Sequence, residues 1–206
     1  MSSALEIVKL ATLASALNRA SRLPPLILVT DDLRLPDPVD AAAGLPRGCA
    51  IILRHRDPVT RSTLAHRLRK VTRERGVMLL ISQDATLACS VGADGLHLPE
   101  RLLGAAAHWK CMRPRWIITT AAHATASVAA AARARADAVL LAPVFPTRSH
   151  PDRSPLGVLR ASNIARQSPV AVYALGGVNA RTATRLAGSA FAGIAGIESL
   201  SGGHSR

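Results

Sequence analysis

Eight short apolar runs recur along this chain, and each is continuous rather than alternating with polar residues. Continuous runs bounded by turn residues are typical of parallel strands that are buried on both faces. The predicted strands are Leu26–Thr30, Ala50–Leu53, Val77–Ser82, Gly95–Leu98, Trp116–Thr120, Ala138–Ala142, Val170–Leu175 and Gly193–Ile197. Helix-forming patterns lie between them at Thr60–Arg75, Thr86–Val91, Ala124–Ala134 and Ala180–Ala187. Strands that alternate with helices predict an α/β barrel or a doubly wound parallel sheet.

A repeated corner before three of the strands favours the barrel. Ala93-Asp94-Gly95, Ala136-Asp137-Ala138 and Ala190-Phe191-Ala192 each place small residues between the end of a helix and the start of a strand. Their spacing of about two βα units is what a closed repeat of such units produces. We therefore predict a single TIM-barrel domain, a (β/α)8 barrel of the phosphate-binding type, over residues 1–206. It has an N-terminal helix within 1–25 and a frayed tail at 201–206.

Charge and cysteine content restrict the classes of partner. The net charge is +13, but the 26 Lys and Arg residues are scattered and only 2% of residues are aromatic. Nucleic acid is therefore the least favoured partner, and small anionic molecules are natural ones. Three widely separated cysteines argue against a disulfide framework or a zinc site and predict a cytoplasmic location.

The chain also lacks the apolar segments that membranes and secretion require. No apolar run approaches the roughly 18 residues of a membrane span. Glu6 and Lys9 interrupt the first apolar stretch, which argues against a secretory signal. We expect no membrane partner, and these patterns leave a homo-oligomer open.

Small residues follow the last two predicted strands. Gly176 and Gly177 come directly after the seventh strand, and Gly196 and Ile197 lie at the end of the eighth. Barrels of this type bind phosphate at these positions because glycine lets the ligand approach the backbone, whose N–H groups then point at the anion. We predict a phosphate site here. The structural alternative is a pair of tight turns that bind nothing.

Basic and imidazole side chains follow other predicted strands at the same end. Arg54 and Arg56 alternate after the second strand, so one of them should face inward, and a guanidinium binds phosphate or carboxylate through paired hydrogen bonds. His123 follows the fifth strand, where an imidazole can transfer protons near neutral pH. The alternatives are two solvated arginines and a histidine that only begins a helix. The acidic residues at this end fall on different loops without a ligand-like motif, so the residues predict no metal site.

Several of these segments together resemble the thiamine phosphate synthase/TenI family. The resemblance extends over residues 26–200 and is carried by SVGADGLHLPE (90–100), ADAVLLAPVFPTRSHPDRSPLG (136–157), ALGGVN (174–179) and GIAGIES (193–199). It implies a TIM barrel that binds a thiazole phosphate over Gly176-Gly177 and the loop after the eighth strand. It also implies contacts to the substrate from Thr147, Ser149 and His150, which occupy the family's P-T-x-[ST]-K loop with histidine in the lysine position.

The resemblance implies one of two reactions. A synthase joins an aminopyrimidine diphosphate to the thiazole phosphate, using Mg²⁺ held by acidic residues. The matching positions here are Gln83 and Leu102, so Asp84 or Glu100 would have to hold the ion instead. A TenI-type tautomerase relocates a proton on a thiazole carboxylate phosphate without a metal, and its acid/base histidine aligns with His123.

We therefore predict a TenI-like isomerase that needs no cofactor. The first alternative is the Mg²⁺-dependent synthase. The second alternative is a non-catalytic barrel that binds a ligand.

Overall fold

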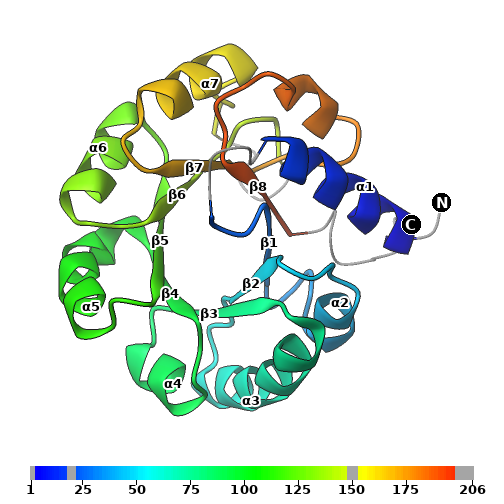
Figure 1. Ribbon diagram of the computed structural model, residues 1–206, viewed down its shortest axis with the longest axis vertical. Helices are drawn as coiled ribbons and strands as arrows, with labels where there is room; N and C mark the ends of the chain where they lie inside the picture. Colours follow the sequence, from blue (N-terminus) through cyan, green and yellow to red (C-terminus); the bar gives the residue numbers. More distant parts are fainter. Residues whose placement is uncertain (1–2, 18–21, 148–152, 198–206) are drawn as a thin grey trace.

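The computed structural model describes residues 3–17, 22–147 and 153–197, and its centre is a closed barrel of parallel strands. The strands are β1 (Leu26–Val29), β2 (Ala50–Leu53), β3 (Met78–Ser82), β4 (Gly95–Leu98), β5 (Ile117–Ala122), β6 (Ala138–Leu141), β7 (Ala171–Ala174) and β8 (Gly193–Gly196). Each strand pairs with the next along the chain, and β8 pairs with β1 through Ile194 opposite Leu26. Figure 1 shows the helices in a ring outside the strands. The predicted TIM barrel is confirmed, and its closure excludes the doubly wound sheet.

Helices link the strands around the outside of the barrel. They are α1 (Ser3–Leu17), α2 (Val39–Ala43), α3 (Pro58–Arg75), α4 (Ala85–Ser90), α5 (Ala106–Met112), α6 (Thr125–Arg133) and α7 (Val158–Gln167), with short 3-10 helices η1 (Glu100–Ala105) and η2 (Ala183–Leu186). The predicted N-terminal helix is confirmed as α1, and three predicted connecting helices as α3, α4 and α6. The α-helix predicted at Ala180–Ala187 is wrong. Only η2 forms there, because the Asn179 side chain accepts the N–H groups of Arg181 and Thr182 and closes a turn.

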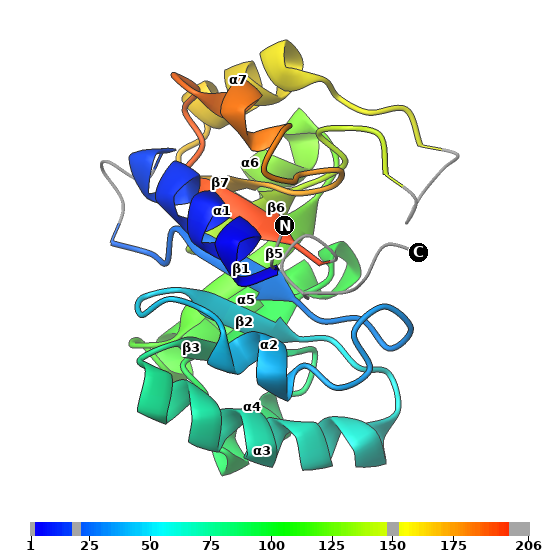
Figure 2. The same ribbon diagram turned by 90° about the vertical axis from the view of Figure 1, so that its right-hand side faces the viewer.

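Alternate residues along the strands fill the barrel interior. The interior cluster is mostly aliphatic and contains Ile27, Val29, Ala50, Ile52, Leu80, Ala138, Leu140, Tyr173 and Ala195. The residues between them pack outward against the helices in a larger apolar cluster. We call the end where the strands finish the mouth; it is formed by the residues from Thr30 after β1 to Ile197 after β8. The segment that follows β1 and the described residues that follow β6 project from this end (Figure 2). Because alternate strand residues point into the barrel, the same alternation indicates which residue at the end of each strand faces into the mouth.

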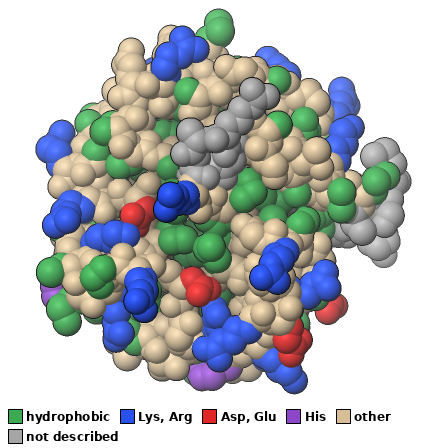
Figure 3. Space-filling view, in the orientation of Figure 1, with side chains coloured by type: hydrophobic (Ala, Val, Ile, Leu, Met, Phe, Trp, Pro, Cys, Tyr) green, Lys and Arg blue, Asp and Glu red, His purple; other side chains and the backbone are tan. Residues whose placement is uncertain are grey.

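The surface carries dispersed positive charge. On the face shown in Figure 3, Lys and Arg side chains are spread out rather than gathered into one stripe. Among the described residues, no helix is long and apolar enough to cross a membrane.

Two of the three repeated corners noted in the sequence, those with Asp94 and Asp137, are structural clamps. The Asp94 carboxylate accepts the N–H of Leu79 at 2.8 Å, and the Asp137 carboxylate accepts the N–H of Ile118, also at 2.8 Å. Each aspartate stands just before one strand and thus holds the start of the preceding strand. Each also binds a cation from a helix: Arg69 contacts Asp94, and Lys110 contacts Asp137. The two corners therefore tie a helix and two strands together.

We expect Asp137→Ala to lower the free energy of unfolding by about 2 kcal/mol, because it removes the acceptor of the Ile118 N–H and leaves the Lys110 ammonium only its bond to the Trp116 carbonyl. Asp40→Ala is the matched control. Asp40 is exposed at the start of α2, so its loss should cost less than about 0.5 kcal/mol. Urea unfolding of both variants measures the difference, and equal losses would contradict the clamp.

Candidate active site

The side chain of Arg54 points into the mouth of the barrel. It continues the alternation of Ala50 and Ile52, both of which lie in the interior cluster. Arg56 is in the same register, but its side chain is 96% exposed and extends into solvent. The intervening His55 points outward, where its ring contacts Thr30 Oγ1 and the Pro36 carbonyl, each at 3.1 Å. Of the two predicted arginines, the structure therefore places only Arg54 toward the predicted site.

The Asp31 carboxylate holds Arg54 in place. Asp31 Oδ2 accepts hydrogen bonds from Arg54 and from Arg34, each at 2.9 Å. The Arg34 guanidinium holds the pKa of the Asp31 carboxyl well below its usual range. Two guanidinium groups thus share one carboxylate, which leaves a net positive charge beside β1 and β2.

His123 lies at the mouth after β5, with its ring orientation set by the backbone. Its Nδ1 lies 2.7 Å from the carbonyl oxygen of Ala142. A carbonyl only accepts, so Nδ1 carries the proton and Nε2 is the ring nitrogen left to take one up. The side chain is half-buried. This arrangement suits acid/base chemistry, which stays a prediction for this residue.

His97 is a second imidazole that our sequence reasoning did not single out. It lies in the middle of β4, buried, with Nδ1 2.9 Å from Thr119 Oγ1 on β5. Burial lowers the pKa of the His97 imidazole to about 4, and the nearby Arg54 guanidinium acts in the same direction. The ring is therefore neutral at neutral pH. The signal in the sequence was a polar residue inside an otherwise apolar strand.

The two glycines after β7 have the backbone conformation that the predicted phosphate site needs. Gly176 and Gly177 have φ angles of 89° and 66°. A Cβ on Gly177 would lie 2.3 Å from the Pro146 carbonyl oxygen and 2.7 Å from the Phe145 Cβ. The Phe145 N–H donates to the Gly176 carbonyl at 3.0 Å. The glycines thus allow the turn after β7 to pack directly on the segment after β6.

The remaining predicted phosphate contacts are placed only in part. Gly196 ends β8 opposite Leu28 of β1, and Ile197 follows it, half-buried. Thr147 is half-buried at the end of the segment that packs on the glycines. Ser149 and His150 lie outside the described residues. Binding at all these positions stays a prediction.

The acidic residues at the mouth do not fit a magnesium ion. Asp84 Oδ1 accepts the Leu87 N–H at the start of α4, and its Oδ2 accepts from Arg61 at 3.0 Å. Glu100 Oε1 accepts from Ser127 Oγ of α6 at 2.6 Å. Throughout the described residues, no three His, Cys, Asp or Glu side chains are grouped so that they could hold a metal ion. The carboxylates are engaged in holding helices and loops rather than open to a cation.

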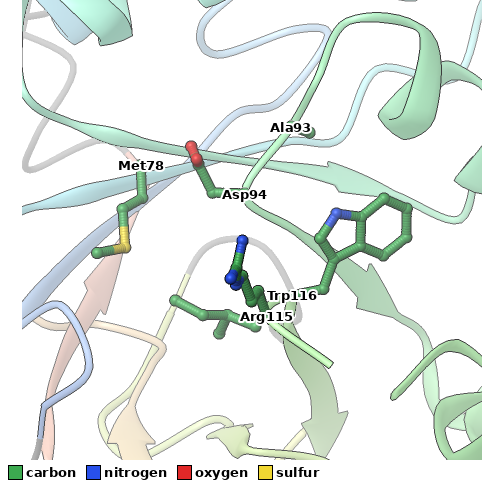
Figure 4. Close-up of a pocket in the computed structure, with 6 residues that line it drawn as sticks. Met78, Ala93, Asp94, Arg115 and Trp116 are labelled. Carbon is green, nitrogen blue, oxygen red and sulfur yellow. The ribbon is translucent and has the colours of Figure 1, made fainter. Parts of the chain in front are cut away.

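Two cavities lie away from the mouth. One, of about 270 Å³, is lined by residues at the starts of β3 and β5 and the corner before β4. Figure 4 shows Met78, Asp94, Arg115 and Trp116 around it. The other, of about 460 Å³, lies along the outer side of α3 and the end of α4. Neither is lined by a predicted site residue.

These features define the chain as a (β/α)8-barrel protein with a basic, histidine-bearing mouth. Over residues 26–200 it matches the family described as thiamine monophosphate synthase (TMP-TENI). The chain belongs to this family, and the predicted resemblance is confirmed.

Individual relatives agree with this assignment. The thiamine-phosphate synthase of Alcanivorax borkumensis is 30% identical over 188 residues, which are 88% of this chain and 87% of that protein. A chain from Aquifex aeolicus is 35% identical over 115 residues, so the matched part spans 56% of this chain and 61% of that relative. The structure of thiamine phosphate pyrophosphorylase from Pyrococcus furiosus has a TM-score of 0.73 at 24% identity and covers 89% of both chains. That structure supports the fold.

Proposed function

We propose that this chain is a thiamine-phosphate synthase, an enzyme that joins a thiazole phosphate to an aminopyrimidine diphosphate. The relative from Alcanivorax borkumensis, similar over nearly the whole of both chains, bears this name. The comparisons thus favour the first alternative from the sequence over the TenI-like isomerase that we predicted first.

The observation in the site that carries the proposal is Arg54, held at the mouth by Asp31 while β7 brings the glycine turn to the same end. A phosphate on the glycine turn and a diphosphate at Arg54 would place two anionic substrates in one mouth. In the reaction, the bond between the pyrimidine methylene carbon and the diphosphate oxygen breaks, and its electron pair leaves with pyrophosphate. The thiazole nitrogen supplies the pair for the new carbon–nitrogen bond. Guanidinium groups near the leaving oxygens stabilise the charge that develops there.

The second candidate is metal-independent isomerisation, and the tautomer of His123 favours it. The Ala142 carbonyl fixes the proton on Nδ1, so Nε2 can remove a proton from a thiazole carboxylate phosphate and return it at another atom.

A paired assay on the purified chain distinguishes the candidates. One arm contains thiazole phosphate, pyrimidine diphosphate and Mg²⁺, and the other contains the thiazole carboxylate phosphate alone. We expect thiamine phosphate in the first arm. Isomerisation without thiamine phosphate would establish the second candidate. If no product forms in either arm, the remaining interpretation is a barrel that only binds a ligand.

We expect His123→Asn to lower any isomerisation rate about 100-fold, because the variant has no imidazole to carry the proton. Binding of the thiazole carboxylate phosphate should change little. His66→Asn is the matched control, since His66 lies on the exposed side of α3 and bonds the Ser62 carbonyl of its own helix. Chromatography of samples quenched at fixed times gives the rates. An unchanged rate in His123→Asn would show that this histidine does not transfer the proton.

A further inference from the structure

The family resemblance implies metal ligands at Gln83 and Leu102, and Gln83 forms a hydrogen-bonded pair with Arg101, the residue just before Leu102. Gln83 follows β3 and Arg101 lies in η1 after β4, 18 residues further along the chain. The Arg101 guanidinium donates to Gln83 Oε1. A neutral amide therefore stands at one position where the resemblance implies a carboxylate ligand, and a guanidinium contacts that amide.

Gln83 is held by the backbone in an unusual conformation. Its φ is 65°, in the left-handed region, and its N–H donates to the His97 carbonyl at 3.0 Å. Gln83 therefore contacts β4 through its backbone N–H and Arg101 through its side chain, at the ends of β3 and β4.

Among the described residues, no acidic side chain forms an ion pair with Arg101. Asp84 is paired with Arg61, and Asp31 is shared by Arg34 and Arg54. Glu100 adjoins Arg101 in sequence and keeps its negative charge, and its Oε1 accepts from Ser127 of α6 rather than from Arg101. The hydrogen-bond partner of Arg101 is the neutral amide of Gln83. On this rim, the Arg101 guanidinium is bonded to a neutral group, and the Arg54 guanidinium shares its carboxylate with Arg34.

We propose that the Arg101 guanidinium, positioned by Gln83 and acting with Arg54, binds the diphosphate of the second substrate in place of a divalent cation. The proposal rests on the proposed function for the identity of that substrate. A guanidinium presents several N–H donors in a planar fork that matches phosphate oxygens, and it keeps its charge at any pH at which the protein is folded. The Arg101 side chain is exposed, so an incoming anion can reach it.

Calorimetric titration with inorganic pyrophosphate, in buffer containing excess EDTA, tests this proposal. We expect binding without a divalent ion. Arg101→Gln should weaken pyrophosphate binding about 10-fold, the loss of one charge-assisted hydrogen-bonding group. Inorganic phosphate, titrated in parallel, should bind both proteins within a factor of about two of one another because the glycine turn does not involve Arg101.

Arg115→Gln is the matched control, since it removes the same charge at the opposite end of the barrel. Pyrophosphate binding that appears only with Mg²⁺ would overturn the proposal. So would equal affinities for Arg101→Gln and the unaltered chain, or equal weakening in the two arginine variants. Failure of the proposed function has a different signature, namely metal-free pyrophosphate binding that depends on Arg101 without any formation of thiamine phosphate.

Discussion

Gly177→Ala is expected to lower the free energy of unfolding by about 3 kcal/mol and to abolish phosphate binding at the turn after β7. The left-handed backbone at φ 66° costs an L-residue about 1–2 kcal/mol. The new Cβ would also meet the Pro146 carbonyl oxygen at 2.3 Å, and displacing that backbone adds about 1–3 kcal/mol. Urea unfolding measures the loss, and titration with inorganic phosphate measures binding.

Gly188→Ala separates the two causes. Gly188 has a φ of 74°, but a Cβ there would have no atom within 4 Å. This variant should cost only the conformational part, about 1 kcal/mol. If both alanine variants lose the same stability, the packing of the glycine turn on the segment after β6 contributes nothing.

A stability loss in mild acid is the second large effect, and we assign it to His97. The pKa of His97 is about 4 in the folded chain and 6.5 in the unfolded chain. Between these values the unfolded state binds a proton that the folded state does not, so the free energy of unfolding falls as the pH drops from about 6.5 toward 4. Between pH 7 and pH 4.5 the loss from this group is about 2.5 kcal/mol.

Urea unfolding of the unaltered chain and of His97→Gln at both pH values isolates this contribution. Carboxylates that become protonated in this range do so in both proteins, and their effects cancel in the difference. The variant should lose about 2.5 kcal/mol less than the unaltered chain on acidification. Parallel losses in the two proteins would show that the pKa of His97 is the same in the folded and unfolded chains.

Much of the fold could be predicted because buried parallel strands leave a strong signal. The predicted run Ala50–Leu53 coincides with β2, and the run Val170–Leu175 exceeds β7 by only one residue at each end. The connecting segments were harder because their structure depends on side-chain hydrogen bonds. At Asn179, for example, the side chain closes a turn where the alanine-rich sequence favours an α-helix. Helices α2, α5 and α7 were not predicted.

The site was less predictable because its decisive contacts join loops that are distant in sequence. Alternation along β2 correctly indicated that an arginine faces inward, but it did not distinguish Arg54 from Arg56. The bond from His123 to the Ala142 carbonyl spans 19 residues and crosses from β5 to the end of β6. The contact between Gln83 and Arg101 likewise has no local signature. The family resemblance indicated that metal ligands were missing, whereas the structure shows that Arg101 contacts Gln83 at one of those positions.

The most direct test of the account is the formation of thiamine phosphate from thiazole phosphate and pyrimidine diphosphate, measured once with Mg²⁺ and once with excess EDTA. We expect product under both conditions, with turnover in EDTA reduced in Arg101→Gln. Isomerisation of the thiazole carboxylate phosphate, with no thiamine phosphate under either condition, would contradict it.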